Sequence, residues 1–255
     1  MYNHKFLLKK SPIDSRDLVH EFVSLNIAQT LPLKVDLTPE LPGVLDQKSL
    51  GSCASQATSN LLKYLLMKEQ LPVFQPSRLY LYWNTRVAIE RSSPSEDTGV
   101  SISDVCKSLT KYHACDEDIW PYIIDEFSAA PPLEAYKNAN LHKKITYKRV
   151  PINLINICHI LASGYPILIG LQIYDSFETE EVMKTGIVPM PNLQKDNLLG
   201  GHCVLLVGYD DNEKKFRIMN SWGTDVGQGG YFELDYSYVL NKNLASDFWT
   251  INLFS

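Results

Sequence analysis

Hydrophobic positions in the first half of the chain recur with the period of an α-helix. In residues 53–70, apolar side chains return every three to four positions, which places them on one face of a helix. Ser52 precedes this run as a candidate N-cap, and Leu71-Pro72 ends it. A shorter run of the same kind predicts a helix near 18–25. Weaker patterns predict further helices over 76–90, 101–112 and 132–139.

The second half changes to short apolar runs bounded by turn residues, which is typical of β-strands. Asp210-Asp211-Asn212 separates two of these runs and predicts a hairpin. Residues 175–200 carry no pattern that assigns an element. The apolar runs predict strands over 145–150, 166–174, 202–211, 214–222, 229–235 and 247–254, with a helix over 153–162.

This change of character divides the 255-residue chain into three parts. Residues 1–30 form a polar appendage, residues 31–144 a mainly helical lobe, and residues 145–255 a β-rich lobe. We therefore expect an α+β fold of two lobes. With 24 Lys and Arg against 29 Asp and Glu, the chain lacks the excess of cations that nucleic acid or an anionic membrane requires of its main partner. No apolar run approaches the roughly 20 residues that span a bilayer.

Cysteine usage bears on the cellular compartment and on metals. The number of cysteines is odd and no pair has C-x-x-C spacing, which disfavours a structural zinc site. We expect no metal and no cofactor. The first residues also lack the long apolar centre of a signal peptide. We therefore expect five thiols in a reducing compartment, the cytoplasm or, for a viral protein, the virus particle: Cys53, Cys106, Cys115, Cys158 and Cys203.

Cys53 differs from the other four cysteines, which we expect to be small buried hydrophobes. It follows Gly51-Ser52 and opens the longest predicted helix. The N-terminus of a helix stabilises a thiolate, and the thiolate is the nucleophilic form. Gln47 stands six residues earlier, where its amide can donate to an oxyanion together with the Cys53 backbone N–H. A polar loop residue is the alternative interpretation of Gln47.

His202 is the candidate base. It follows Gly200-Gly201, and two glycines indicate close approach by another backbone. Two strands joined by a tight turn would place Asn220 beside it, where an amide fixes the tautomer of the imidazole. Trp222 then either covers that hydrogen bond from water or belongs to the core. A purely structural histidine at a strand end is the alternative.

The ordered set of these motifs resembles the papain-like cysteine proteases. The resemblance extends from about Leu31 to the C-terminus and includes DTGVSISD (97–104). It implies a two-lobed fold, with a helical N-terminal lobe, a β-barrel-like C-terminal lobe and the active site in the cleft between them. It also implies hydrolysis of peptide or protein substrates through a thioester acyl-enzyme. The motifs that carry it are Gln47, Gly51-Ser52-Cys53, Gly201-His202 and Asn220-Ser221-Trp222-Gly223.

Carried over by position, the resemblance also implies residue roles. Leu50 stands where the family signature has its first cysteine, so the disulfide usual beside the site cannot form. This departure resembles the disulfide-poor bacterial and viral members. The implied catalytic residues are Cys53, His202 and Asn220, the oxyanion donors are Gln47 and the Cys53 N–H, and the substrate-binding residues are Gly99, Gly201 and Trp222.

The sequence thus predicts a cysteine peptidase, and an endopeptidase in particular. Two other functions fit the same residues: a catalytically silent, protease-like shell that binds peptides, and an acyltransferase in which an amine replaces water. Residues 1–30 are either a short inhibitory segment of a zymogen, lying in or near the cleft, or a disordered or edge-packed terminus.

Overall fold

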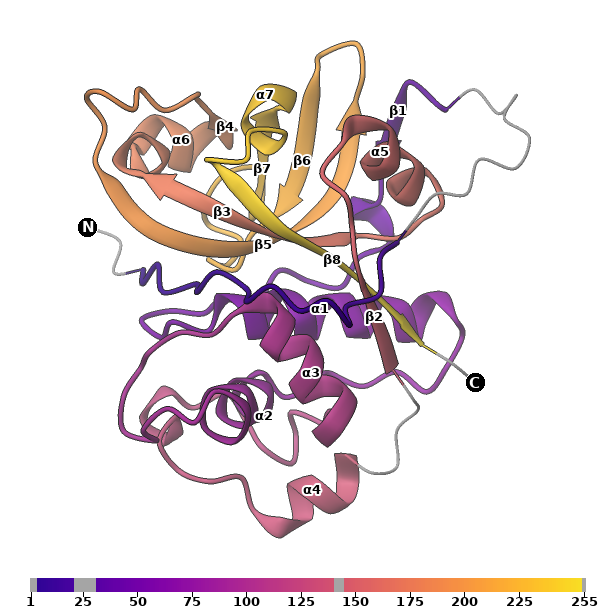
Figure 1. Cartoon of the computed structure of the whole chain (residues 1–255), viewed down its shortest axis with the longest axis vertical. Helices are drawn as coiled ribbons and strands as arrows, with labels where there is room; N and C mark the ends of the chain where they lie inside the picture. Colours follow the sequence, from indigo (N-terminus) through magenta and orange to yellow (C-terminus); the bar gives the residue numbers. More distant parts are fainter. Residues whose placement is uncertain (1–3, 21–30, 140–144, 254–255) are drawn as a thin grey trace.

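Two lobes lie one above the other in the computed structural model, which describes residues 4–20, 31–139 and 145–253 (Figure 1). The lower lobe is helical, and the helix α2 continues as a π-helical turn over Asn84–Ile89. The predicted helices over 53–70, 76–90, 101–112 and 132–139 are confirmed. They are α1 (Cys53–Lys68), α2 (Arg78–Trp83), α3 (Ile102–Tyr112) and α4 (Leu133–Ala139).

The upper lobe is built on one sheet, whose strand order is β2-β8-β3-β5-β6-β7-β4, with β1 also paired to β5. All pairs are antiparallel except β4 with β7. The predicted hairpin is present, because Asp210 pairs with Lys215. The strands are β1 (Lys34–Asp36), β2 (Ile145–Arg149), β3 (Ile167–Tyr174), β4 (Ile187–Val188), β5 (Leu198–Asp210), β6 (Lys215–Met219), β7 (Tyr231–Asp235) and β8 (Ala245–Leu253).

Short helices complete this lobe. The predicted helix over 153–162 is α5 (Leu154–Ala162). Residues 175–200, to which the sequence assigned no element, hold a 3-10 turn over Asp175–Glu178, α6 (Glu180–Thr185), β4 and the start of β5. Helix α7 (Tyr236–Val239) follows β7.

Strand β5 is buried on both faces, and this explains its unbroken apolar sequence. Successive side chains of a strand point to opposite faces. Val204 and Leu206 accordingly enter the core of the upper lobe. Cys203 and Leu205 enter the second core, which the sheet shares with α1. The same alternation directs His202 away from the face that packs on α1.

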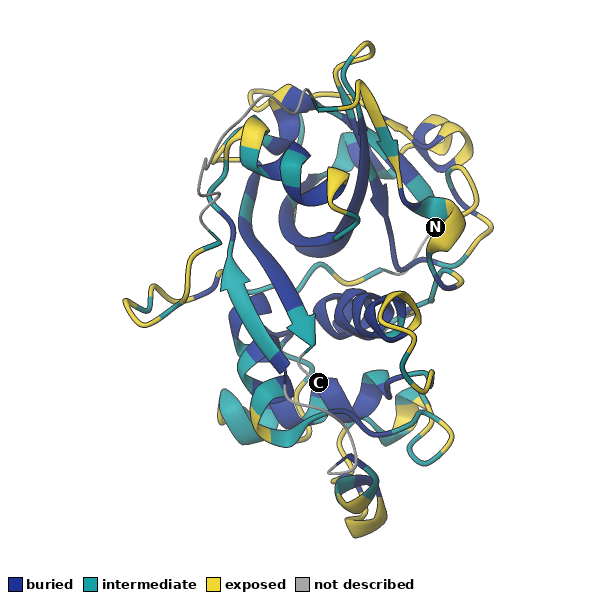
Figure 2. Cartoon of the chain, turned by 90° about the vertical axis from the view of Figure 1, so that its right-hand side faces the viewer, coloured by how far each residue is buried: buried dark blue, intermediate teal, exposed yellow. Residues whose placement is uncertain are grey.

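Helix α1 lies between the lobes and is buried along most of its length (Figure 2). It begins at Cys53, as the sequence predicts. Ser52 occupies the N-cap position but its side chain makes no capping hydrogen bond, which corrects the predicted role. Its Oγ instead lies 2.7 Å from Tyr122 Oη and accepts from Gln56 Nε2 at 3.1 Å.

Residues 4–11, which we call the interlobe segment, run between the two lobes (Figure 1, indigo). The Leu8 N–H donates to Gly201 O at 3.0 Å, in the upper lobe. The Lys9 N–H donates to Val100 O at 3.1 Å, in the lower lobe. The segment therefore joins both walls of the interface through its backbone.

The helix predicted near 18–25 is wrong at its first residue. Leu18 is extended, and its carbonyl accepts from the Arg149 N–H at 2.8 Å, while the His20 N–H donates to Arg149 O at 2.7 Å. Residues 18–20 thus pair with the free edge of β2, and these hydrogen bonds outweigh a weak local helix pattern. Phe22, Val23 and Leu25 lie outside the described residues.

Candidate functional site

The hydrogen bonds of His202 define its tautomer. Its Nε2 lies 2.7 Å from Asn220 Oδ1, and the Ser221 N–H donates to the same oxygen at 2.8 Å. Because an amide oxygen only accepts, Nε2 carries the proton in the neutral ring. The other nitrogen, Nδ1, then holds a free lone pair. It is buried and has no hydrogen-bond partner among the described residues.

Trp222 covers this hydrogen bond, as one of the two sequence interpretations proposed, and it also belongs to the core. Its ring stacks on His202 with centroids 5.1 Å apart and contacts Phe177 and Phe232 edge-on. The indole also stacks on His4 of the interlobe segment, with centroids 4.3 Å apart. Water is therefore excluded from the His202–Asn220 pair.

Cys53 begins α1 and is only 1% exposed. Burial raises the pKa of its thiol to about 11, and this outweighs the backbone hydrogen bonds that stabilise the thiolate. Burial likewise lowers the pKa of His202 to about 4. Both groups are therefore neutral at pH 7 in this structure. The thiolate predicted at the helix N-terminus is disfavoured here because the site is dehydrated.

Gln47 is fixed to the opposite lobe by two hydrogen bonds with Ser221. The backbone N–H of Gln47 donates to the backbone carbonyl of Ser221 at 2.8 Å, and its side-chain Oε1 accepts from Ser221 Oγ at 2.8 Å. The amide nitrogen consequently points the other way, to Leu50 O at 3.1 Å and to Lys5 O of the interlobe segment at 3.3 Å. Sequence reasoning assigned no role to Ser221, although it stands inside the motif that identified Asn220.

The loop before Cys53 is held without a disulfide. Leu50, which replaces the cysteine of the family signature, is 2% exposed in the lower core. The carboxylate of Asp97 accepts from the Gly51 N–H at 3.1 and 3.2 Å and from Tyr82 Oη at 2.5 Å. Tyr82 Oη in turn accepts from the Gly99 N–H at 3.1 Å. The sequence assigns Asp97 no role beyond its place in the DTGVSISD motif, although it stands two residues before Gly99.

Glycines line the path of the interlobe segment. A Cβ on Gly99, whose φ is +64°, would lie 1.8 Å from Leu7 O. On Gly201 it would lie 2.5 Å from Leu8 O. The close approach of another backbone, expected from the glycines before His202, is therefore confirmed. All three predicted substrate-binding residues, Trp222 included, lie against this segment.

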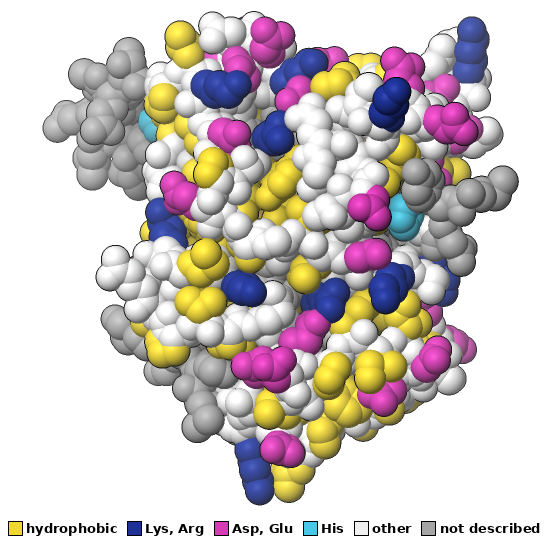
Figure 3. Space-filling view, turned by 180° about the vertical axis from the view of Figure 1, so that it is seen from behind, with side chains coloured by type: hydrophobic (Ala, Val, Ile, Leu, Met, Phe, Trp, Pro, Cys, Tyr) yellow, Lys and Arg dark blue, Asp and Glu magenta, His cyan; other side chains and the backbone are white. Residues whose placement is uncertain are grey.

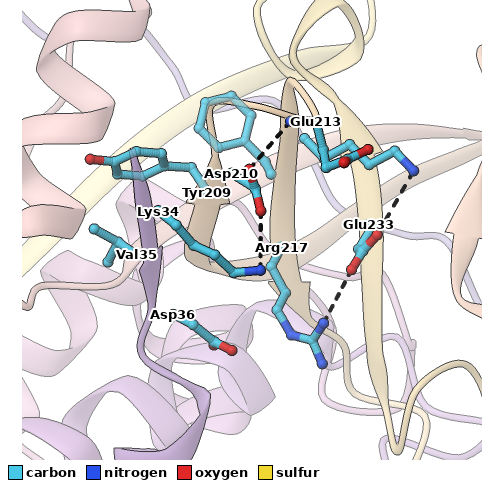
Figure 4. A pocket seen from close by; sticks show the side chains of 10 residues that line it. Lys34, Val35, Asp36, Tyr209, Asp210, Glu213, Arg217 and Glu233 are labelled. Atoms are coloured by element: carbon cyan, nitrogen blue, oxygen red, sulfur yellow. Dashed lines mark hydrogen bonds and ion pairs between the residues drawn. The ribbon is translucent and has the colours of Figure 1, made fainter. Parts of the chain in front are cut away.

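Other parts of the described surface offer less chemistry. Lys, Arg, Asp and Glu side chains are interspersed over the face seen from behind (Figure 3). A hollow of about 120 Å³ beside β1, β5 and β6 is lined by charged residues of both signs, and all three of its cations lie in ion pairs, among them Lys34–Asp210 and Arg217–Glu233 (Figure 4). Among the described residues no group of three or more His, Cys, Asp or Glu could hold a metal ion. No helix there is long and apolar enough to cross a membrane.

Comparisons with known proteins agree with this geometry. The sequence pattern of the papain family of cysteine proteases matches residues 31–248. A peptidase C1-like protein of Acanthamoeba polyphaga mimivirus is 38% identical over 227 residues, which are 86% of this chain and 72% of that protein. The crystal structure of xylellain, a cysteine protease from Xylella fastidiosa, superposes with a TM-score of 0.92 at 35% identity, covering 100% of this chain and 98% of that one. A procathepsin L 3 of Tenebrio molitor shares the fold, with a TM-score of 0.72 at 18% identity over 98% of this chain and 76% of that one.

Proposed function

Because this chain belongs to the papain family of cysteine proteases and is a cysteine peptidase, we propose that Cys53 is its nucleophile, His202 its acid and base, and Asn220 the residue that orients His202. The observation that carries these assignments is the hydrogen bond from His202 Nε2 to Asn220 Oδ1. It leaves Nδ1 free to take a proton. The alternative of a silent shell is disfavoured because all the implied residues are present and because His202 and Asn220 are hydrogen-bonded to each other.

The reaction proceeds through an acyl-enzyme. His202 Nδ1 takes the thiol proton, and Cys53 Sγ bonds to the carbonyl carbon of the substrate. The amide of Gln47 and the Cys53 N–H donate to the oxyanion. When the C–N bond breaks, His202 gives its proton to the leaving amine and a thioester remains. His202 then takes a proton from water, which attacks the thioester carbonyl carbon. The C–S bond breaks, the acid leaves, and His202 returns the proton to Cys53 Sγ.

We further propose that the interlobe segment inhibits the peptidase as part of a short propeptide within residues 1–30. Three observations support this. The segment contacts the predicted substrate-binding residues Gly99, Gly201 and Trp222. Its Lys5 carbonyl accepts from the predicted oxyanion donor. With the segment in place Cys53 is only 1% exposed, and burial keeps its thiol protonated by raising its pKa to about 11.

The continuous path of this segment also supports an endopeptidase. It passes from Trp222, which stacks on His4, to Ser101, which forms a bridge with Lys9. A peptide can therefore extend beyond the reacting bond in both directions. The five free, buried cysteines support a reducing compartment, and the interspersed surface charges support peptides or proteins rather than nucleic acid as partners.

One experiment tests the nucleophile and the inhibitory segment together. A recognition sequence for a narrow-specificity serine protease is inserted between the exposed residues Ser15 and Arg16, and the folded full chain is cut and dialysed. Intact mass and peptide mapping then follow labelling by a peptide-like epoxide. We expect one adduct on Cys53, formed at least tenfold faster after cutting. The adduct should disappear in Cys53→Ala and persist in the control Cys158→Ala.

The outcomes separate the two proposals. Equal labelling rates before and after cutting would remove the inhibitory role and keep the nucleophile. Labelling of another cysteine, or peptide hydrolysis by Cys53→Ala, would overturn the catalytic assignment.

A further inference from the structure

A carboxylate is fixed in place beside the oxyanion donor. Asp97 Oδ1 lies 2.5 Å from Tyr82 Oη, and both carboxylate oxygens accept from the Gly51 N–H. Burial, followed by the charge of Asp97, raises the pKa of Tyr82, so the phenol stays protonated and donates. These contacts hold Asp97 from two sides, so its orientation does not depend on a ligand.

The interlobe segment presents a cation to this carboxylate. Lys5 Nζ lies 2.7 Å from Asp97 Oδ2, and the two side chains are 44% and 9% exposed. Arg86 also acts on this region, but its terminal nitrogens donate to backbone carbonyls of residues 93, 94, 96 and 127. Departure of the segment therefore removes the ammonium group that covers Oδ2.

Lys5 identifies the substrate residue that faces Asp97. Its carbonyl oxygen accepts from Gln47 Nε2 at 3.3 Å, while its own side chain reaches Asp97. One residue thus contacts both groups. In a substrate, the carbonyl bound by the oxyanion donor belongs to the residue on the amino side of the scissile bond. Asp97 is part of the wall beside this carbonyl site, and we expect it to face the side chain of that substrate residue.

We propose, building on the peptidase function proposed above, that Asp97 is a specificity-determining residue that selects lysine or arginine on the amino side of the scissile bond. Lys5 occupies this site in the inhibited chain. An ammonium or guanidinium group forms a charge-assisted hydrogen bond with a carboxylate that needs no reorientation. A neutral side chain leaves Oδ2 to water.

The test uses full chain cut after folding between Ser15 and Arg16, and two fluorogenic peptides that differ only at the residue before the scissile bond. One peptide carries arginine and the other carries citrulline, its neutral isostere. We expect kcat/KM to favour arginine on the order of tenfold. Asp97→Asn, which keeps an oxygen for Tyr82 and Gly51, should bring this ratio close to one. The matched control Glu96→Gln removes an exposed carboxylate one residue away and should keep the ratio.

A binding measurement separates this inference from the peptidase proposal. Fluorescence anisotropy gives the affinity of cut Cys53→Ala chain for the same two peptides, with and without Asp97→Asn. Tighter binding of the arginine peptide that depends on Asp97 supports the inference even where turnover is absent. Equal kcat/KM and equal affinity for both peptides overturn it and leave the peptidase intact. An equal loss of kcat/KM for both peptides in Asp97→Asn also overturns the inference, because Asp97 then only supports the loop.

Discussion

At the scale of single residues, hydration decides the chemical state of the site. Cys53 and His202 are both buried. Burial raises the pKa of the Cys53 thiol and lowers the pKa of the His202 imidazole, and both shifts favour the neutral form. We expect release of the interlobe segment to rehydrate them. The opposite charges, together with the helix N-terminus, can then stabilise a thiolate and an imidazolium.

We therefore expect the thiolate to appear only after the segment leaves. The absorbance difference at 240 nm between wild type and Cys53→Ala should be negligible at pH 7 in the intact chain and positive in the cut chain.

The pKa of His202 also predicts how acid changes the release of the segment. Because burial lowers the pKa of His202 from 6.5 to about 4, hydrated states bind more protons between these values. Acidification from pH 6.5 to 4 should thus favour release, measured as faster epoxide labelling. Full thiolate absorbance in the intact chain at pH 7 would contradict this account.

Ser221 should act through Gln47. In the cut chain, Gln47→Ala should lower kcat by about 10²–10³-fold. Ser221→Ala frees the Gln47 amide to rotate and should lower kcat by about tenfold with KM little changed. The buried hydroxyl of Ser108 makes no hydrogen bond within the described residues, so Ser108→Ala is the control that should keep kcat. A change confined to KM in Ser221→Ala would argue against a positioning role.

At the scale of elements, a buried guanidinium shapes the loop that carries Asp97. Arg86 lies in the π-helical turn after α2 and donates to the carbonyls of Ser93, Pro94 and Glu96, and across to Phe127. A buried carbonyl without a partner is costly. Arg86 therefore supports the backbone of residues 93–96, while Tyr82 and the Gly51 N–H hold Asp97.

Arg86→Met should lower the free energy of unfolding by about 2–4 kcal/mol, because four backbone carbonyls lose the charged donor that Arg86 supplies. Urea denaturation measures this. The exposed Arg91→Met should change stability by less than about 0.5 kcal/mol. Comparable stabilities for the two variants would show that the loop holds itself.

The sequence predicted those helices and turns that are determined by residues close to one another along the chain. The helix beginning at Cys53 and the hairpin after Asp210 follow from periodicity and turn residues, and both are present. Residues 175–200 escaped assignment because their elements are two to six residues long. The contacts of Lys5 with Asp97, 92 residues away, join distant parts of the chain, and no local pattern encodes them. The same reason explains the wrong helix at Leu18, where pairing with β2 prevails.

At the scale of the whole molecule, the two lobes are hydrogen-bonded to each other, and the interlobe segment is hydrogen-bonded to both of them. Gln47 of the lower lobe is hydrogen-bonded to Ser221 of the upper lobe, and the segment is bonded to both walls. Ion pairs from Lys5 to Asp97 and from Lys9 to Glu90 add to the backbone bonds. The segment has the contacts of a ligand that is part of the same chain.

A synthetic peptide of residues 4–15 should therefore inhibit the cut chain in trans, competitively with a peptide substrate. The same peptide with Lys5→Gln and Lys9→Gln loses both ion pairs and should inhibit about tenfold more weakly. A peptide with the same composition in scrambled order is the control. Inhibition by the scrambled peptide to the same extent would show that the interlobe contacts are not specific.

The pairing of residues 18–20 with β2 has a consequence for control of the enzyme. It tethers the interlobe segment through only residues 12–17, so the segment experiences an effective concentration on the order of 1 mM. At that concentration, a dissociation constant of about 10 μM is enough for about 99% occupancy. Once the tether is cut and the enzyme is diluted to nanomolar levels, the same affinity leaves the site almost empty. Scission of one peptide bond can therefore act as an all-or-none switch without any change in the contacts themselves.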